Sequence, residues 1–191
     1  MKIAVASGKG GTGKSTVSVN LAYLLSNQNN NTVLVDCDVE EPNCHLFLNS
    51  KFKHSEKVYV STPKIDKDKC TSCGKCAKIC EFNALAFIKN NVVIFDELCH
   101  GCGNCKLNCP SLAITDSQRE VGTIEADLEA NLKHIQGKTR IGEAMSPPLI
   151  KAVKNFADSK GFKIQIIDSP PGTSCPVINT VYGAVSYTHL R

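Results

Sequence analysis

The sequence has no tryptophan and only two methionines, and aromatic residues make up 6% of its 191 residues. It also has no apolar run that approaches the roughly 20 residues a membrane-spanning helix needs. The net charge is only +4, so the charge balance does not point to nucleic acid as a partner. Met1 leads directly into a short strand-like segment, without the features of a secretory signal peptide. We therefore expect no transmembrane segment, and the length allows one domain of usual size plus a small second one.

A glycine-rich stretch near the amino terminus fits the phosphate-loop pattern, in which a glycine and four residues precede Gly-Lys-Ser/Thr. The stretch consists of Gly8, Lys9, Gly10, Gly11, Thr12, Gly13, Lys14, Ser15 and Thr16. A β-branched apolar segment precedes it at residues 2–6, and apolar residues recur at helical spacing through residues 15–28. In a strand, loop and helix arrangement, backbone N–H groups and the positive helix end hold phosphates. We expect Lys14 to reach the terminal phosphates and the Ser15 hydroxyl to ligate Mg²⁺.

Two further predicted strands end in acidic residues. The apolar residues 32–35 are followed by Asp36 and Asp38, and residues 162–167 are followed by Asp168. Acids at the carboxyl ends of parallel strands lie where open α/β sheets bind their ligands. The alternative for Asp168 is a structural cap at the end of its strand.

The phosphate loop resembles that of the deviant Walker A ATPases, because Lys9 sits one residue into the loop. This is the family of MinD, ParA, the Mrp-type cluster carriers and the nitrogenase iron protein. The resemblance implies Mg²⁺-dependent ATP hydrolysis by a homodimer in which Lys9 crosses to the nucleotide of the partner subunit. It also implies that Asp38 positions the attacking water, that Asp168 binds Mg²⁺ through water, and that the backbone of Gly172 senses the terminal phosphate. Without the resemblance, Lys9 is simply a solvated lysine of a loop.

Cysteine is the residue that this sequence has in excess, with 11 copies. In a small secreted protein such a number would indicate disulfide bonds. A nucleotide-binding chain is expected in the cytoplasm, where disulfides are rare and cysteine clusters usually bind metal. The composition therefore predicts a cytoplasmic metalloprotein.

Eight of the cysteines form two runs with the spacing C-x2-C-x2-C-x3-C. This is the pattern of a bacterial two-cluster ferredoxin, in which three cysteines of a run hold one [4Fe–4S] cluster and the fourth holds the other. We expect a first cysteine set of Cys70, Cys73, Cys76 and Cys109 and a second cysteine set of Cys99, Cys102, Cys105 and Cys80. The alternative is structural zinc, whose sites typically pair C-x2-C units and fit two crossed runs poorly.

The segment between the two runs predicts a β-hairpin, since residues 84–88 and 92–95 flank Lys89-Asn90-Asn91. Ferredoxins of this type have such a hairpin. Asn43 is expected to cap a helix, with a nucleotide contact as the alternative. The remaining cysteines have no partner at ligand spacing and are expected to be buried; they are Cys37, Cys44 and Cys175.

The expected fold class is α/β: an incomplete, parallel-sheet P-loop NTPase with an inserted α+β ferredoxin-like domain. The expected parts are residues 1–63 and 116–184 for the ATPase, 64–115 for the insert, and 185–191 for a non-native tail of a truncated chain. Within the second ATPase part, residues 120–126 and 132–141 are expected to form two surface strands.

Together these features predict an ATPase whose nucleotide state is coupled to electron transfer through two [4Fe–4S] clusters to a redox partner protein. One alternative is an iron–sulfur cluster carrier, although four-thiolate clusters of the ferredoxin type are retained well and a carrier needs labile sites. A second is a positioning ATPase with a passive ferredoxin module, which needs a terminal amphipathic helix or a basic patch. A cobyrinic acid a,c-diamide synthase type of amidoligase ranks last, because no glutaminase domain follows.

Overall fold

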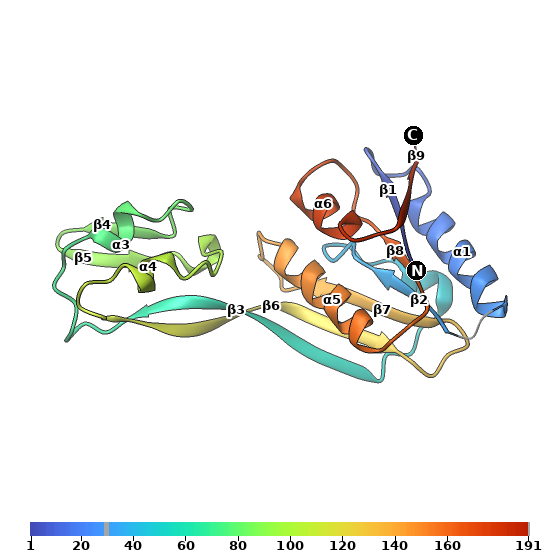
Figure 1. Cartoon of the computed structure of the whole chain (residues 1–191), viewed down its shortest axis with the longest axis horizontal. Coiled ribbons are helices and arrows are strands. Elements are labelled where there is room, and N and C mark those ends of the chain that lie inside the picture. The colour runs from blue at the N-terminus through green and yellow to red at the C-terminus, as the bar shows by residue number, and fades with distance from the viewer. Residues whose placement is uncertain (29–30, 191) are drawn as a thin grey trace. The chain divides into compact units, whose positions relative to one another are not determined.

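The computed structural model describes residues 1–28 and 31–190, and the chain divides into two compact units (Figure 1). The first unit comprises Met1–Val58, Val121–Ile141 and Ser146–Arg191. The second unit comprises Tyr59–Glu120 and Gly142–Met145. Two strands, β3 (His54–Ile65) and β6 (Ile114–Asp127), begin or end in one unit and continue into the other.

The first unit is built on a mixed sheet with the strand order β3-β6-β7-β2-β8-β1-β9. Its other strands are β1 (Lys2–Ser7), β2 (Thr32–Asp36), β7 (Lys133–Thr139), β8 (Ile164–Asp168) and β9 (Ser186–Leu190). The strands from β7 to β9 pair in parallel, whereas β6 runs antiparallel to β7. The expected α/β fold class is confirmed.

Helices cover both faces of this sheet. They are α1 (Lys14–Gln28), α2 (Cys44–Leu48), α5 (Pro147–Ser159) and α6 (Cys175–Val181). Strand β2 is buried along its whole length, as expected of a parallel strand covered on both sides. Leu34 of β2 packs in a cluster with Val19 and Ala22 of α1. Helix α5 packs on β7 and β2 with its apolar side fully buried (Figure 1).

The strand register brings distant acids together at one edge of the sheet. Asp36 at the end of β2 pairs with Asp168 at the end of β8, and Val5 of β1 also pairs with Asp168. Because these strands are parallel, the loops that follow all three leave from the same edge. The phosphate loop follows β1 and therefore lies at this edge too.

One expectation about the sheet requires correction. Residues 132–141 were expected at the surface, but β7 lies inside the sheet between β6 and β2, with His134 and Ile135 fully buried. Because β7 carries polar residues such as His134 and Gln136, its sequence does not show the continuous apolar run expected of an interior strand. Ser186–Leu190, which falls within the predicted non-native tail of residues 185–191, forms β9 beside β1. The non-native origin of that segment stays a prediction. An unpaired strand edge readily takes up another extended segment.

The second unit contains a small hairpin and two short helices. Strands β4 (Leu85–Ile88) and β5 (Asn91–Ile94) pair antiparallel. Lys89 and Asn90 between them both have positive φ, as a two-residue hairpin turn of type I′ requires. The predicted hairpin is confirmed. Helices α3 (Lys75–Lys78) and α4 (Asn104–Leu107) and the 3₁₀ turn η1 (Asp96–Leu98) complete the unit.

Membrane-spanning helices are not found in residues 1–28 and 31–190, where no helix combines the required length with the required apolar character.

Candidate functional site

The glycine-rich loop leaves open space where a phosphate would bind. A Cβ atom built on Gly10, Gly11 or Gly13 would meet no atom within 4 Å. Gly11 and Gly13 have φ angles of +73° and +89°, which favour glycine. The buried Thr12 hydroxyl has no hydrogen-bond partner in the described part of the chain. An open backbone cradle with a free hydroxyl at a helix start fits a phosphate group.

The two lysines of the loop differ in their environment. Lys14, the first residue of α1, is buried, and its Nζ lies 3.4 Å from the backbone oxygen of Lys9. The side chain therefore folds back over the loop. Lys9 is exposed, so its ammonium group is accessible to other molecules.

Asp168 is the centre of the polar network at this edge of the sheet. It is fully buried, and its carboxylate accepts 2.7 Å hydrogen bonds from the hydroxyls of Ser15 and Ser18. The Cys44 thiol donates to the same carboxylate at 3.4 Å. The sequence reasoning found Ser15 but missed Ser18, whose position three residues along the same helix was the available signal.

Asp36 is held by backbone groups of the loop that follows β2. Its carboxylate accepts hydrogen bonds from the backbone N–H groups of Asp38, Asn43 and Cys44 at 3.0, 3.2 and 3.1 Å. Asp36 therefore shapes the loop that carries Asp38. Asn43 occupies the expected position before the first residue of α2, but its side chain makes no capping hydrogen bond there. The Asp36 carboxylate takes up the backbone N–H groups of that turn instead.

The three acids at this edge disfavour one another's charge. Burial and the nearby Asp168 raise the pKa of Asp36 to about 7 and that of Asp38 to about 6. Burial also raises the pKa of Asp168, although the hydrogen bond from Ser15 opposes this shift. A cation would relieve the repulsion, and carboxylate and hydroxyl oxygens are the ligands that Mg²⁺ prefers. The Ser15 hydroxyl and the Asp168 carboxylate, 2.7 Å apart, are oxygen groups that would suit such a cation.

Gly172 lies in the loop after β8, which is fastened to β1. Its N–H donates to the backbone oxygen of Ser7 at 3.0 Å, and its φ of +103° requires glycine. The N–H of Ser169 donates to the backbone oxygen of Val5. The structure therefore places Gly172 beside the start of the phosphate loop.

The second unit gathers the eight cysteines of the two runs around two cavities. One cavity is lined by all four members of the first cysteine set, Cys70, Cys73, Cys76 and Cys109. Another is lined by all four members of the second cysteine set, Cys99, Cys102, Cys105 and Cys80. In each group the fourth cysteine comes from the other run. Four thiols around one cavity form the donor set of a [4Fe–4S] cluster.

The loops that carry these cysteines require glycine. Gly74 and Gly103 have φ angles of +67° and +74° at equivalent points of the two runs. A Cβ atom on Gly101 would lie 2.9 Å from the backbone oxygen of Ser61. Burial raises the pKa of Cys76 and of Cys105, and a bound metal would favour the thiolate form of both.

The three cysteines outside the runs behave differently from one another. Cys37 and Cys44 are fully buried, as expected. Cys175 is exposed at the first residue of α6, so its expected burial is wrong. The sheet covers the first two, whereas the start of α6 lies outside the core.

Comparison with known proteins agrees with the geometry of the first unit. Residues 3–162 match the model of the CobQ/CobB/MinD/ParA nucleotide binding domain. The chain belongs to this family. An uncharacterized protein of Methanocaldococcus jannaschii is 42% identical over 182 residues, which cover 95% of this chain and 63% of that protein. This member of the CobQ/CobB/MinD/ParA family thus spans less than two thirds of that relative.

Two further comparisons concern the insert and the solved structures. A ferredoxin of Pyrobaculum islandicum is 32% identical over 108 residues, covering 56% of this chain and 89% of the ferredoxin. This family member therefore has ferredoxin-like homology in its middle region. The septum site-determining protein MinD of Pyrococcus horikoshii, solved as a complex with Mg-ADP, has a TM-score of 0.49 and 16% identity. That match covers 99% of this chain and 56% of the MinD chain.

Proposed function

We propose that this protein is a cytoplasmic Mg²⁺-dependent ATPase whose nucleotide state is coupled to electron transfer through two [4Fe–4S] clusters. The observation that carries the proposal is the presence, in one chain, of a P-loop with a Ser15–Asp168 pair and of two cavities each lined by four cysteines. Neither half alone requires the other. Their combination favours a protein that uses nucleotide to control a redox module.

In the first unit, each polar group of the site has a role in ATP hydrolysis. The open loop from Gly8 to Thr16 and the folded-back Lys14 bind the phosphates, and the Ser15 hydroxyl and Asp168 hold Mg²⁺. Asp38, with its raised pKa, sits in a turn shaped by Asp36 and orients the attacking water. The exposed Lys9 completes the site of a partner subunit in an ATP-dependent homodimer.

The cysteine half holds two groups that each store one electron when bound. The residues of this chain supply eight thiolate ligands and an apolar surround that limits water. Ala84, Leu85 and Ile114 are buried in one cluster with Cys99 and Cys105. Such a surround tunes the reduction potential and slows oxidation by solvent. A redox partner protein would exchange electrons at this unit.

The covalent path between the two halves makes coupling physically reasonable. Strand β3 leaves the loop region after Asp38 and α2 and enters the second unit, and β6 returns from it. Gly142–Met145 also belongs to the second unit although both of its chain neighbours belong to the first. A change in the loop after β2 or β7 therefore acts on segments that continue into the cysteine unit.

The test is ATP hydrolysis by the anaerobically purified protein with its clusters oxidised and then reduced. We expect Mg²⁺-dependent hydrolysis whose rate changes several-fold with redox state. The Lys14→Ala variant controls for contaminating activity and should be inactive in both states. An equal rate in both states would disprove the coupling, and no hydrolysis above the Lys14→Ala background would disprove the ATPase.

The exposure of one cysteine in each set supports a second candidate, an iron–sulfur cluster carrier. Cys73 and Cys102 are exposed, and an exposed ligand is where an acceptor thiol would attack. Incubation with an apo-acceptor during ATP turnover separates the two functions. Loss of iron to the acceptor would favour the carrier, and full retention would favour electron transfer.

A further inference from the structure

The two cysteine runs form an internal repeat that allows equivalent positions to be compared. In each run a glycine with positive φ precedes a one-turn helix, and the fourth cysteine follows that helix. Two residues after the fourth cysteine stands Phe82 in the first run and Ser111 in the second. The following residues, Asn83 and Leu112, have nearly identical φ angles of 52° and 51°. Phe82 and Ser111 therefore occupy matching places beside different cavities.

Ser111 gives the first cysteine set a hydrogen bond that Phe82, its equivalent in the other run, has no hydroxyl to supply. The Ser111 hydroxyl lies 3.6 Å from the Cys109 sulfur, and the N–H of Ala113 lies 3.4 Å from the same sulfur. A ligating thiolate carries no proton, so both groups then donate to it. Among the described residues, no other side-chain hydroxyl hydrogen-bonds a cysteine sulfur of the insert. Hydrogen bonds to cluster sulfur are one of the factors that set the potential.

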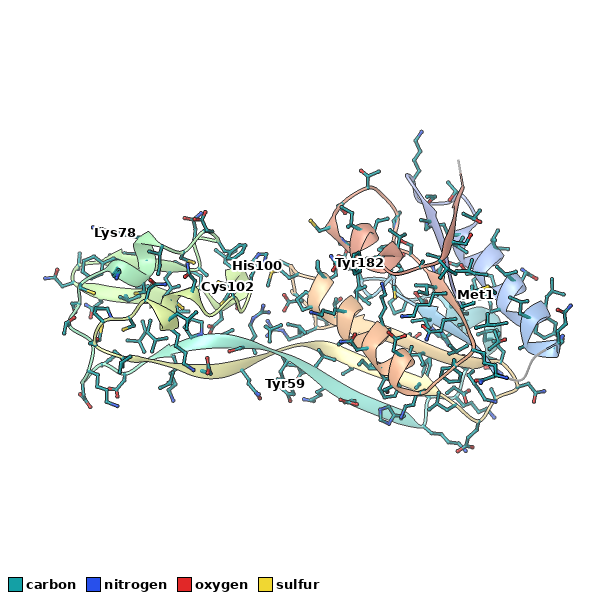
Figure 2. All side chains as sticks on the ribbon, viewed as in Figure 1. Met1, Tyr59, Lys78, His100, Cys102 and Tyr182 are labelled. Carbon is teal, nitrogen blue, oxygen red and sulfur yellow. The ribbon has the colours of Figure 1, made fainter. Side chains whose placement is uncertain are left out.

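Phe82 gives the second cysteine set an aromatic cover. The rings of Phe82 and His100 stack with their centroids 3.8 Å apart and an angle of 12° between their planes. Both residues line the cavity of the second set, and neither lines that of the first. Figure 2 labels His100 and the nearby Cys102 of this set. The position equivalent to His100 in the first run is Thr71, which lines the first cavity.

The cysteine ligands of the second set are also more deeply buried than those of the first set. Cys99 and Cys105 of the second set are buried, whereas their equivalents Cys70 and Cys76 are only partly buried. Adding an electron to a four-thiolate cluster makes it more negative, and burial disfavours extra charge. Charged side chains do not offset this difference. Among the described residues, the first cavity has no charged side chain in its lining, and Lys106 and Asp116 of the second form an ion pair with each other.

We infer that the cluster held by the first cysteine set has the higher reduction potential, and that the Ser111 hydroxyl supplies part of the difference. This inference rests on the proposed function, because it requires both clusters. An external one-electron reductant then loses one electron, and the first set's cluster is the one reduced by it. The second set's cluster is reduced only at lower potential. Electrons within the unit therefore run from the second set toward the first.

The test is a redox titration of the anaerobically purified protein with dithionite, without nucleotide, followed by electron paramagnetic resonance. We expect two separate one-electron steps. We call the reduction at higher potential the upper step and the reduction at lower potential the lower step. Ser111→Ala should lower the potential of the upper step by about 59 mV, which is a factor of about ten in the equilibrium constant for one electron. It should leave the potential of the lower step unchanged. Phe82→Ser should raise the lower step. Ser117→Ala removes a hydroxyl in the same unit that lines neither cysteine cavity, and it should move neither step.

The possible outcomes separate this inference from the function on which it rests. Two coincident steps, a lower step that moves in Ser111→Ala, or no effect of Ser111→Ala would each overturn the assignment. If Ser111→Ala fails to fold, Phe82→Ser still decides, since an unmoved or lowered second step contradicts the inference. Iron and sulfide below two clusters per chain in the wild type would refute the cluster half of the proposed function itself.

Discussion

The Ser15 hydroxyl donates a 2.7 Å hydrogen bond to the carboxylate of Asp168, although 153 positions separate the two residues in the sequence. The register of β1, β2 and β8 creates this contact by ending the three strands at one edge. Ser18 donates to the other oxygen of the same carboxylate. Asp168 is thus fixed in orientation by two serines of one helix before any ligand binds.

Ser18 should act as a positioning residue for the Mg²⁺ site. We expect Ser18→Ala to weaken the apparent Mg²⁺ affinity about 10-fold to 100-fold, because groups that orient a metal ligand typically contribute that much. Asp168→Asn should abolish Mg²⁺-dependent hydrolysis. The measurement is the ATPase rate as a function of Mg²⁺ concentration.

Ser26→Ala is the matched control for this substitution. Ser26 is also a buried serine of α1, but its hydroxyl donates to the backbone oxygen of Tyr23. It should leave the Mg²⁺ dependence unchanged. Equal effects of the two substitutions would show that Ser18 acts only through helix stability.

The sequence predicted those parts of the site that are formed by residues close to one another in the chain. The phosphate loop and the first three cysteines of each run place their groups within one short loop, so their patterns can be read without tertiary information. The crossed fourth cysteine was predicted from the spacing typical of two-cluster ferredoxins. Cys44 could not be assigned, and the helical spacing of Ser18 from Ser15 was only a partial signal, because the role of both residues depends on the register that brings Asp168 to them. The interior position of β7 was missed for a similar reason, since its burial comes from neighbours distant in sequence.

The buried His134 should make the first unit sensitive to acid. Burial, and then the nearby His45, lower the pKa of His134 to about 3, although Asp127 opposes the shift. Its Nδ1 lies 2.8 Å from the Ser50 hydroxyl, and its Nε2 has no partner in the described part of the chain. Below the usual histidine pKa of about 6.5 the unfolded chain therefore binds a proton that the folded chain does not. Stability is fully present above that pH and is lost as the pH falls toward 3.

His134→Leu measures this contribution directly. Between about pH 7.5 and about pH 5, the wild type should lose about 2 kcal/mol more of its unfolding free energy than the variant does. Urea denaturation at several pH values, followed by circular dichroism, gives both curves. Parallel curves would mean that His134 has the same pKa in the folded and in the unfolded protein.

The three cysteines outside the runs should differ sharply in reactivity. Cys175 is exposed, whereas burial and, after it, the negative Asp36 raise the pKa of both Cys37 and Cys44. Only the thiolate is alkylated at a useful rate. In the anaerobic, cluster-loaded protein, iodoacetamide should therefore label Cys175 and leave the other two unmodified.

Peptide mass spectrometry identifies the labelled positions, with a sample unfolded in denaturant as the reference for full modification. The Cys175→Ser variant should show no labelling at these three positions while folded. Rapid modification of Cys44 in the native protein would indicate that the loop after β2 opens and exposes the Asp168 network.

Breaking the ion pair between Arg119 and Glu143 should destabilise the second unit more than breaking an exposed pair does. Both side chains are almost completely buried, and Glu143 also accepts a hydrogen bond from the N–H of Met145. Removing one partner leaves an uncompensated buried charge, which typically costs about 3–5 kcal/mol. We expect Arg119→Met to lower the denaturation midpoint of the cysteine unit. The measurement is the loss of the visible absorbance of the clusters as denaturant is added.

A double substitution distinguishes the lost pair from lost packing. Arg119→Met combined with Glu143→Met should recover most of the stability, because apolar replacement of a whole buried pair is often neutral or favourable. Lys69→Met breaks the solvent-accessible pair with Asp66 in the same unit and should leave the midpoint unchanged, since water and salt screen such pairs. If the double variant is less stable than either single variant, packing and not charge holds Gly142–Met145 in the second unit. If it recovers, the loss in the single variant comes from the unpaired buried charge, and apolar packing at the same two positions also holds the segment between β7 and α5 in the second unit.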